Sequence, residues 1–289
     1  MLGSLRSSLK KIDLLYKLYI KVMNPENGIT ALNVLKSFSP FKPNSAGSYR
    51  VRSALTISTI NNVFPSLENL LPFSSGIAIP TLNVDQFMDD PENLRSSLRL
   101  ADSFNYYGSD KSTRHDYHKI YGPILNDFSS IKKILEVGLG TNNSDIVSTM
   151  GSSGKPGASL RAFRDFCPYA DIYGADIDSR ILFQEERIET YYVDQLSITS
   201  LRELASNTGT DFDLVIDDGL HSPDANINTL VLGLSIVKVN GWVVIEDIGQ
   251  TAGHQALWVV TSTLLDQKRF KATLLKCKGA FVLAVQRIS

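Results

Sequence analysis

The chain has 289 residues, of which 43% are hydrophobic and 20% are charged. This composition supports one large or two moderate hydrophobic cores and argues against a disordered chain. Lysine and arginine total 29 while aspartate and glutamate total 30, so the formal charge of −1 provides no basic field for a nucleic-acid backbone. We therefore expect no nucleic acid among the partners of the protein.

Cysteine usage and the start of the chain bear on the cellular compartment. Cys167 and Cys277 belong to no CxxC or Cys/His cluster, which disfavours a disulfide framework or a zinc site. The first apolar residues are interrupted by Asp13, Lys17 and Lys21, so they form no continuous secretory signal. No run approaches the roughly 20 apolar residues that span a bilayer. We expect a cytoplasmic protein without a membrane span.

The N-terminal third differs in character from the rest of the chain. Apolar side chains recur at helical spacing over residues 5–22, with basic residues between them, and predict an amphipathic helix. Such a helix packs on its own domain or on a second subunit, or it lies on an anionic membrane surface. We favour packing and expect a homo-oligomer. Turn-forming residues follow over 24–80, and Asp90-Pro91-Glu92 is typical of a helix start. We place an N-terminal accessory or oligomerisation region at 1–104 and a second domain at 105–289.

From Lys132 onward, short apolar runs alternate with helical stretches, a pattern that predicts βαβ crossovers and a mostly parallel sheet. The last two apolar runs are joined only by Lys278-Gly279, so they must form a hairpin whose final strand is antiparallel. We expect an α/β fold with a seven-stranded sheet. Its strands are expected at 134–137, 172–175, 190–193, 212–216, 242–245, 272–277 and 281–285, and its helices at 158–166, 200–206, 224–237 and 255–266.

The end of the first expected strand of this sheet carries a ligand-binding pattern. Ligands of open α/β sheets bind beyond the carboxyl ends of the strands. Gly138 and Gly140 lie there and allow a tight turn and a close approach of a ligand to the backbone. Asn143 leaves the GxGxxG dinucleotide fingerprint incomplete. The preceding Glu136 suits a cationic amino group better than a pyrophosphate.

The next two strands also end in polar residues. Asp176 is placed to accept hydrogen bonds from both hydroxyls of a ribose, although a helix cap or a surface charge is the alternative. We expect Asp178 to serve as a cap or a supporting residue. Asp194 and Gln195, after the third strand, are placed to contact an adenine edge, although strand ends also carry aspartate for turns alone.

A set of acidic residues follows the fourth and fifth strands, whose carboxyl ends should be neighbours. Asp218, Glu246 and Asp247 would repel one another there unless a cation lay between them. Such an all-oxygen set selects Mg²⁺ first and Mn²⁺ or Ca²⁺ after it. His221 would stand beside the metal as a base. The alternative is that Asp217 and Asp218 cap the following helix and His221 is structural, but the whole set favours the metal site.

The combination of motifs resembles one group of proteins, the metal-dependent macrolide-sugar O-methyltransferases of the mycinamicin and macrocin type, and is similar to cephalosporin-hydroxylase-like methyltransferases. The resemblance covers about residues 105–250. The motifs that carry it are Gly108-Ser109-Asp110-Lys111, His115-x-Tyr117, Glu136-Val137-Gly138-Leu139-Gly140, Gly157-Ala158-Ser159-Leu160, Tyr173-Gly174-Ala175-Asp176-Ile177-Asp178, Asp194-Gln195, Asp218-x-x-His221 and Glu246-Asp247.

The resemblance implies a Rossmann-like methyltransferase fold and the cofactor S-adenosylmethionine, whose amino-acid portion would meet Glu136. It also implies Mg²⁺ (or Mn²⁺) held by Asp218, Glu246 and Asp247, a catalytic base at His221, and a hydroxyl of a sugar or glycosylated metabolite as acceptor. Two alternatives stay open. The acceptor is a catechol-like or other non-sugar diol, or the protein is an idle scaffold that binds the cofactor.

Each of the remaining candidate residues and segments has two interpretations. The resemblance favours a lid over the cofactor built from Asp110, Lys111, His115 and Tyr117, against surface charge and packing. His254 faces the acceptor or lies exposed at a helix start. The loop 141–156 either folds over cofactor or substrate or is an ordinary surface excursion.

Overall fold

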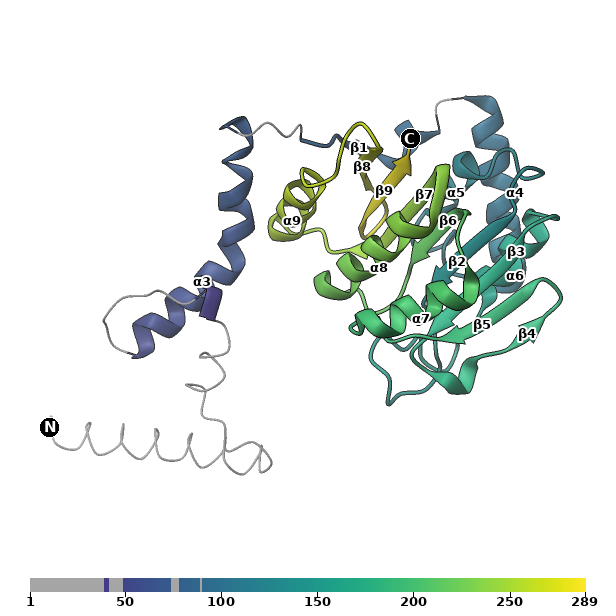
Figure 1. The fold of residues 1–289 in the computed structure, drawn as a ribbon, viewed down its shortest axis with the longest axis horizontal. Coiled ribbons are helices and arrows are strands. Elements are labelled where there is room, and N and C mark those ends of the chain that lie inside the picture. Colours follow the sequence, from purple (N-terminus) through teal and green to yellow (C-terminus); the bar gives the residue numbers. More distant parts are fainter. Residues whose placement is uncertain (1–38, 42–48, 74–77, 89) are drawn as a thin grey trace, which may run out of the picture. The chain divides into compact units, whose positions relative to one another are not determined.

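A computed structural model describes residues 39–41, 49–73, 78–88 and 90–289 (Figure 1). The chain divides into two compact units, residues 1–66 and 67–289. In the first unit the described elements are the 3-10 helix η1 (Ser39–Phe41) and helix α3 (Tyr49–Glu68), which ends just inside the second unit. The amphipathic helix predicted over residues 5–22 lies outside the described residues.

A nine-stranded sheet forms the centre of the unit 67–289, with the strand order β1-β8-β9-β7-β6-β2-β3-β5-β4 (Figure 1). All seven predicted strands are present, and two short strands extend the edges. The bounds are β1 Thr81–Asn83, β2 Lys133–Val137, β3 Asp171–Asp176, β4 Gln184–Glu185, β5 Ile188–Tyr192, β6 Phe212–Asp217, β7 Val237–Ile248, β8 Phe270–Lys276 and β9 Phe281–Arg287. β9 runs antiparallel to both β7 and β8, which confirms the predicted hairpin.

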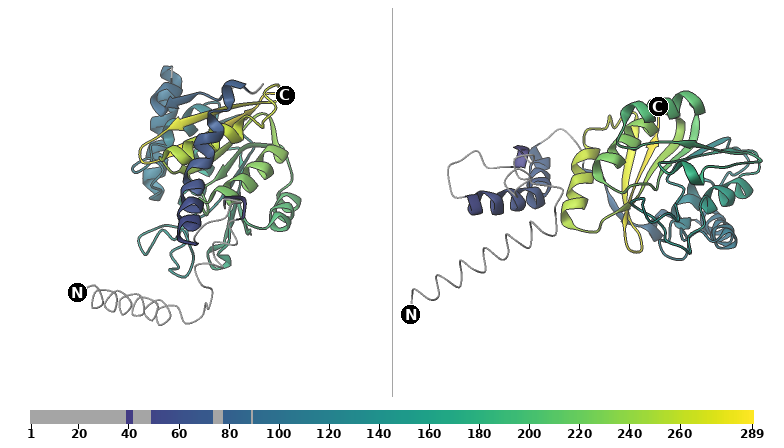
Figure 2. Two further views of the ribbon diagram at one scale, coloured as in Figure 1. Left: turned by 90° about the vertical axis from the view of Figure 1, so that its left-hand side faces the viewer. Right: turned by 90° about the horizontal axis from the view of Figure 1, so that it is seen from below.

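Helices cover both faces of this sheet (Figures 1 and 2). One face carries α4 (Pro91–Tyr107), α5 (His118–Ile124) and α6 (Ala158–Phe166), and the other carries α7 (Ile198–Thr208), α8 (Pro223–Ile236) and α9 (Ala252–Ser262). The 3-10 helices η2 (Leu71–Phe73), η3 (Val84–Phe87) and η4 (Ser179–Ile181) lie in the connections. The helices predicted at 158–166, 200–206, 224–237 and 255–266 are all confirmed, within a few residues at their ends.

Burial on both faces explains why the central strands have continuous apolar runs. Ile134 of β2 packs into the cluster beneath α4, α5 and α6, while the next residue, Leu135, packs into the cluster beneath α7, α8 and α9. Leu214 and Val215 of β6 divide in the same way. Successive side chains of a strand point to opposite faces, so a strand covered twice needs apolar residues at every position.

Helix α4 shows where the domain boundary differs from the expectation. As predicted, it begins after the Asp90 cap, whose side chain accepts the backbone N–H groups of Glu92 and Asn93. Its Phe104 is fully buried and meets Phe163 of α6 at a ring-centroid distance of 5.3 Å. The boundary at residue 104 would cut through this packing, because an amphipathic helix does not reveal which core it covers. The compact unit begins at Leu67 instead. Among the described residues, no helix is long and apolar enough to cross a membrane.

Candidate functional site

The turns after β2 and β6 touch at the carboxyl edge of the sheet. Gly138 has a φ of +103°, and a Cβ at this position would lie 2.0 Å from the carbonyl oxygen of Asp218. The backbone N–H of Asp218 in turn donates to the carbonyl of Val137 at 2.8 Å. Any larger residue at 138 would separate the two turns. The glycine therefore brings Asp218 against the end of the first central strand.

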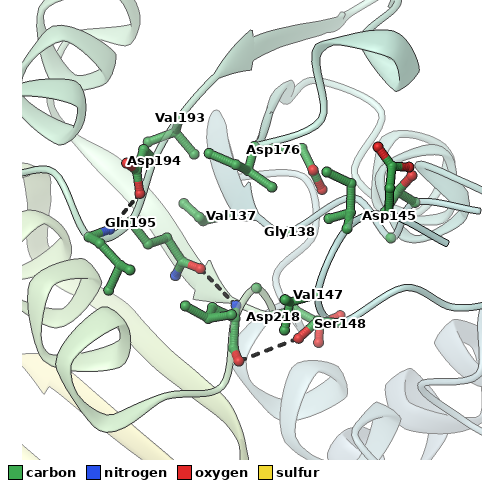
Figure 3. Close-up of a pocket in the computed structure, with 17 residues that line it drawn as sticks. Val137, Gly138, Asp145, Val147, Ser148, Asp176, Val193, Asp194, Gln195 and Asp218 are labelled. Atoms are coloured by element: carbon green, nitrogen blue, oxygen red, sulfur yellow. Dashed lines mark hydrogen bonds between the residues drawn. The ribbon is translucent and has the colours of Figure 1, made fainter. Parts of the chain in front are cut away.

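A cavity of about 380 Å³ opens beside this contact, at the ends of β2, β3, β5 and β6 (Figure 3). Its wall is mostly apolar, and its acidic residues come from different strand ends and from one loop. The lining residues include Gly138, Gly140, Asp145, Val147, Ser148, Asp176, Ile177, Val193, Asp194, Gln195, Leu196 and Asp218. The residues predicted to contact the cofactor, except Glu136, therefore meet in one place: Gly138, Gly140, Asp176, Asp194 and Gln195.

Asp176 and Asp178, at the end of β3, have different hydrogen-bond partners. Asp176 is buried and accepts the backbone N–H groups of Leu139 at 2.7 Å and Asp178 at 2.8 Å. Burial raises the pKa of Asp176, and these backbone bonds oppose the rise. Asp178 caps η4 and accepts hydrogen bonds from Thr141 and Asn143, which confirms its predicted supporting role.

Asp194 and Gln195 have different positions relative to the cavity. Asp194 is half-buried, and its Oδ1 accepts only the backbone N–H of Leu196, at 2.9 Å, among the described residues. The Gln195 side-chain amide makes its hydrogen bonds to other groups of the protein. It donates to Asp217 and Thr229 at 2.8 Å each, and its oxygen accepts the backbone N–H of Leu220 at 2.8 Å. Gln195 thus holds the turn that carries Asp218.

A second, more polar cavity of about 260 Å³ adjoins the first. Gly138, Gly140, Ser148 and Asp218 line both cavities, so the two meet at the turn after β2. The second cavity is lined by acidic, basic and hydroxyl side chains, including Ser109, Asp110, Lys111, Arg114, His115, Tyr117, Lys155, Asp218, His221, Glu246 and Asp247. A ligand in each cavity would bring two reactive groups together at this junction.

Three side chains of the second cavity converge as a candidate metal site. One ligand atom each from Asp218, His221 and Asp247 lies within 4.8 Å of the others. Nε2 of His221 is 3.9 Å from Oδ1 of Asp218 and 3.6 Å from Oδ2 of Asp247. His221 and Asp247 both have left-handed backbones, with φ of +57° and +54°. Such conformations are costly outside glycine and cluster at functional sites.

Glu246 belongs to a different group, centred on Lys111. The Lys111 Nζ contacts Oδ2 of Asp218 and Oε2 of Glu246 at 2.6 Å each, and Oε1 of Glu136 at 3.0 Å. The other Glu246 oxygen accepts the Tyr121 hydroxyl. Within the predicted set, Glu246 faces Lys111 and Asp247 faces His221, while Asp218 faces both, with Oδ2 on Lys111 and Oδ1 toward His221. Lys111 thus supplies a positive charge beside Asp218 and Glu246, and the predicted metal ligand set of Asp218, Glu246 and Asp247 stays a prediction.

The pKa values in the Lys111 group follow from burial and charge. Burial lowers the pKa of Lys111, but attraction to Asp218, Glu246 and Glu136 outweighs it and raises the pKa well above its usual value. Burial raises the pKa of Glu246; Lys111 opposes this and repulsion from the neighbouring carboxylates adds to it. Lys111 therefore stays charged at neutral pH. Its single positive charge does not compensate all the carboxylates around it.

Glu136 lines neither cavity. It is fully buried, and its Oε2 accepts the Ser159 hydroxyl at 2.5 Å while Oε1 faces Lys111. The sequence argument assigned Glu136 to a cationic group of a ligand, and in the structure the cationic group beside it belongs to the protein.

The remaining candidate residues are partly brought to the site. Tyr117 is buried, and its hydroxyl donates to Oδ1 of Asp247 at 2.5 Å. His115 stacks on the Tyr117 ring, with Nδ1 at 3.5 Å from the same Asp247 oxygen and Nε2 at 3.8 Å from Asp110. His254 lines neither of these two cavities, and its backbone N–H and ring contact Thr251 at the start of α9.

The loop 141–156 lines both cavities. Asp145 and Ser148 lie in the first, and Met150 and Lys155 lie in the second. The loop is therefore part of the site and not an ordinary surface excursion.

Sequence reasoning missed one supporting residue and did not foresee the burial of another. Lys111 was expected in a lid; it lines the second cavity and is only 2% exposed. Tyr121, which holds Glu246, was not considered. A signal was present, since Tyr117 and Tyr121 are four residues apart and therefore share one face of a helix.

No family model matches the sequence. The chain is 28% identical over 187 residues to the 8-demethyl-8-alpha-L-rhamnosyl tetracenomycin-C 2'-O-methyltransferase of Streptomyces olivaceus, which spans 64% of this chain and 42% of that protein. It is 40% identical over 93 residues to the mycinamicin VI 2''-O-methyltransferase of Micromonospora griseorubida, which spans 32% of this chain and 23% of that protein. The chain thus matches less than half the length of each of these relatives.

A solved structure is similar to this chain in its fold. The MycE methyltransferase from the mycinamycin biosynthetic pathway, in complex with Mg, SAH and mycinamycin VI, matches with a TM-score of 0.53 at 24% identity, over 65% of this chain and 54% of that chain. Together with the strand order and the antiparallel β9, this likeness shows that the sheet-bearing unit has the Rossmann-like fold of class I S-adenosylmethionine-dependent methyltransferases.

Proposed function

We propose that the protein is an O-methyltransferase that transfers a methyl group from S-adenosylmethionine to a hydroxyl of a sugar or glycosylated small molecule, assisted by a divalent ion. The observation that carries this proposal is the junction of the two cavities, where Gly138 and Asp218 line both. A cofactor in the mostly apolar cavity would present its methyl group to an acceptor in the polar one. The similarity to sugar O-methyltransferases supports the class of acceptor.

The first cavity has the groups that an adenosyl cofactor needs, and its volume of about 380 Å³ lies within the range of small-molecule sites. Asp176 has further lone pairs for ribose hydroxyls besides its two backbone bonds. In this proposal Asp194 accepts the exocyclic amine of the adenine, and Ile177 and Leu196, which line the same cavity, offer apolar surface to the purine. In this proposal Gln195 supports the pocket and does not contact the base.

Asp218 and Asp247 fit a hard divalent ion such as Mg²⁺ or Mn²⁺. Each has one oxygen bound by the protein, Asp218 by Lys111 and Asp247 by Tyr117. Among the described residues, the other oxygen of each accepts no hydrogen bond and faces His221. A bound ion would orient neighbouring hydroxyls of the acceptor and lower the pKa of one of them. Lys111 and Tyr117 keep the two carboxylates in the required orientation.

His221 is the proposed general base. Its Nε2 would take the proton of the acceptor hydroxyl as the oxygen bonds the methyl carbon and the carbon–sulfur bond breaks, leaving S-adenosylhomocysteine as a neutral thioether. Histidine is the side chain that most often serves as a general base in enzymes. His221 has a left-handed backbone, and its ring lies near Asp218 and Asp247.

Methyl transfer from labelled S-adenosylmethionine tests the proposal on a panel of free sugars, glycosylated metabolites and catechols, with Mg²⁺ and after EDTA. We expect transfer to a sugar hydroxyl only with the metal. Transfer confined to catechols would move the acceptor to a non-sugar diol. Cofactor binding without transfer to any acceptor would support the idle scaffold. An undiminished rate after complete metal removal would refute the role of the ion.

A further inference from the structure

Arg114 and Lys155 are cationic side chains that line the second cavity without an acidic partner. Both residues are exposed, and neither forms an ion pair with a carboxylate of the described residues. Lys111, the third cation in this lining, has carboxylate oxygens of three residues within 3.0 Å. Among the described residues that line the first cavity, none is cationic. Unpaired positive charge therefore belongs to the polar cavity, at Arg114 and Lys155.

The backbone at the end of α4 determines where Lys155 lies. Gly108 caps α4 with a left-handed φ of +78°, and a Cβ there would lie 2.8 Å from Nζ of Lys155 and 2.9 Å from its Cδ. The lysine side chain thus packs against this glycine, next to the segment 109–111 that lines the same cavity. A side chain at 108 would displace Lys155, so the glycine keeps this cation beside the polar cavity.

The fixed charges around the second cavity favour an anionic ligand. Five carboxylates and three cations surround it, namely Asp110, Glu136, Asp218, Glu246 and Asp247, and Lys111, Arg114 and Lys155. One divalent ion cancels the two surplus negative charges. S-adenosylmethionine has one net positive charge, because its sulfonium and ammonium outweigh its carboxylate. With ion and cofactor bound, a singly charged anion as acceptor makes the site neutral, and complementary charge favours that acceptor over a neutral one.

The size of the cavity places the anionic group near the reacting hydroxyl. The volume of about 260 Å³ lies below the roughly 300 Å³ at which sites for drug-sized ligands begin, so the cavity suits one sugar unit better than a whole glycoside. Arg114 and Lys155 line the same small space as Asp218 and His221. A guanidinium binds a carboxylate or phosphate through two parallel N–H bonds, and an ammonium binds either group as a point charge.

We propose that the acceptor carries a negatively charged group, a carboxylate or a phosphate ester, on the methylated sugar unit or its linkage, and that Arg114 and Lys155 bind this group. The identity of the reaction rests on the proposed function. The preference for an anion rests on the two unpaired cations and on the charge balance of the cavity.

Matched pairs of acceptors test the preference. Methyl β-D-glucuronide is compared with methyl β-D-glucoside, and glucose 6-phosphate with glucose. Calorimetry measures their binding to the full-length protein with Mg²⁺ and S-adenosylhomocysteine, and labelled S-adenosylmethionine gives kcat/KM. We expect at least one anion to bind about 5-fold or more tightly than its neutral partner, which is the range of one or two partly exposed ion pairs. Added salt should reduce this preference, and the pair that shows it identifies the anion.

Substitutions then assign the preference to the two cations. Arg114→Gln and Lys155→Gln remove the charge but keep a polar side chain, and each should lower the preference for the anion about 2- to 5-fold. The double variant should bind the anionic and neutral members of a pair equally. Arg202→Gln is the matched control, because Arg202 is an exposed arginine on α7 that lines neither of the two cavities. It should keep the wild-type preference.

The carboxylate of the cofactor is the competing partner for these cations. 5'-Methylthioadenosine lacks the amino-acid portion, so its binding compared with that of S-adenosylhomocysteine isolates the contribution of that portion. We expect both to bind the double variant as they bind wild type. Weaker binding of S-adenosylhomocysteine alone, with an unchanged preference for anionic acceptors, would assign Arg114 and Lys155 to the cofactor and overturn the proposal.

The remaining outcomes separate this inference from the proposed function. The proposal is overturned if neither anion binds better than its neutral partner, and metal-dependent transfer to neutral sugars would then leave the proposed function standing. Anion binding that is lost in the double variant, in a protein that transfers no methyl group, would refute the proposed function but leave the anion site at Arg114 and Lys155.

Discussion

Tyr117→Phe is the substitution that best tests how Asp247 is held. The Tyr117 hydroxyl donates to Oδ1 of Asp247 at 2.5 Å and accepts the Asp247 backbone N–H at 3.3 Å. The ring is 1% exposed and stacks on His115 at 5.0 Å, so phenylalanine keeps the packing and removes only the hydroxyl. The substitution therefore isolates the contribution of the hydroxyl to the orientation of one carboxylate.

The size of the effect follows from the exposure of Asp247. A hydrogen bond to a charged group contributes about 1.5 to 3 kcal/mol. The Asp247 side chain is 25% exposed, so water replaces part of the loss. We expect a decrease of about 1.5 kcal/mol in the free energy of unfolding, near the lower limit of that range. Groups that orient a metal ligand typically change metal affinity about 10- to 100-fold, so Mn²⁺ should bind at least about 10-fold more weakly.

The assay is a Mn²⁺ titration followed by electron paramagnetic resonance, with thermal melts of the same samples. Tyr107→Phe is the matched control, because the Tyr107 hydroxyl also donates to a carboxylate, that of Asp165, at the protein surface. It should leave Mn²⁺ affinity unchanged. Wild-type Mn²⁺ affinity in Tyr117→Phe would refute the reasoning, because Asp247 would then need no support from Tyr117 or would not hold the ion.

Further outcomes can be measured on the same protein. Asp176→Ala should weaken S-adenosylmethionine binding by roughly 1.5 to 3 kcal/mol for each lost hydrogen bond, and unchanged calorimetric affinity would remove Asp176 from the site. His221→Ala should keep ion and cofactor but lose about 10²- to 10⁴-fold in rate; loss of the ion would make His221 a ligand. Burial raises the pKa of Cys167 to about 12, so native protein at pH 8 should not react there with a thiol reagent, whereas urea-unfolded protein should. Light scattering should give more than the monomer mass of 31.9 kDa if the predicted homo-oligomer forms.

The sheet was predictable because its signals are local. The inner strands β6, β7 and β9 contain continuous apolar runs, and coverage of both sheet faces by helices makes such runs necessary. β1 and β4 were missed because three and two residues are too short to show a pattern. The junction at Gly138 and Asp218 was also predictable in outline, since the carboxyl ends of neighbouring parallel strands meet at one edge.

The sequence did not allow a prediction of which partner each carboxylate oxygen in the site contacts. The sequence places Asp218, Glu246 and Asp247 at one edge but does not say which way each carboxylate turns. Glu246 and Asp247 are consecutive in β7, but the pairing of β7 with β9 shifts register between Ile245 and Ile248, and Asp247 has a left-handed backbone. One reaches Lys111 and Tyr121 beneath the sheet edge, and the other reaches Tyr117 and the cavity. This local irregularity of the strand, which no sequence pattern shows, gives different partners to two residues that the sequence argument had grouped.

Lys111 shows why a buried charge is the hardest feature to read from a sequence. A lysine next to an aspartate, in a turn after a helix, has the local pattern of a solvent-exposed residue. Its partners Asp218 and Glu246 are 107 and 135 residues away along the chain, and no short-range pattern links them. Each partner read separately also resembles a surface charge. Burial of the ammonium becomes favourable only when the fold brings the carboxylates to it, because a buried charge is costly without partners of opposite sign. The position of a cation in this cluster is therefore a property of the sheet edge as a whole, and replacing Lys111 tests that edge more directly than replacing any single carboxylate.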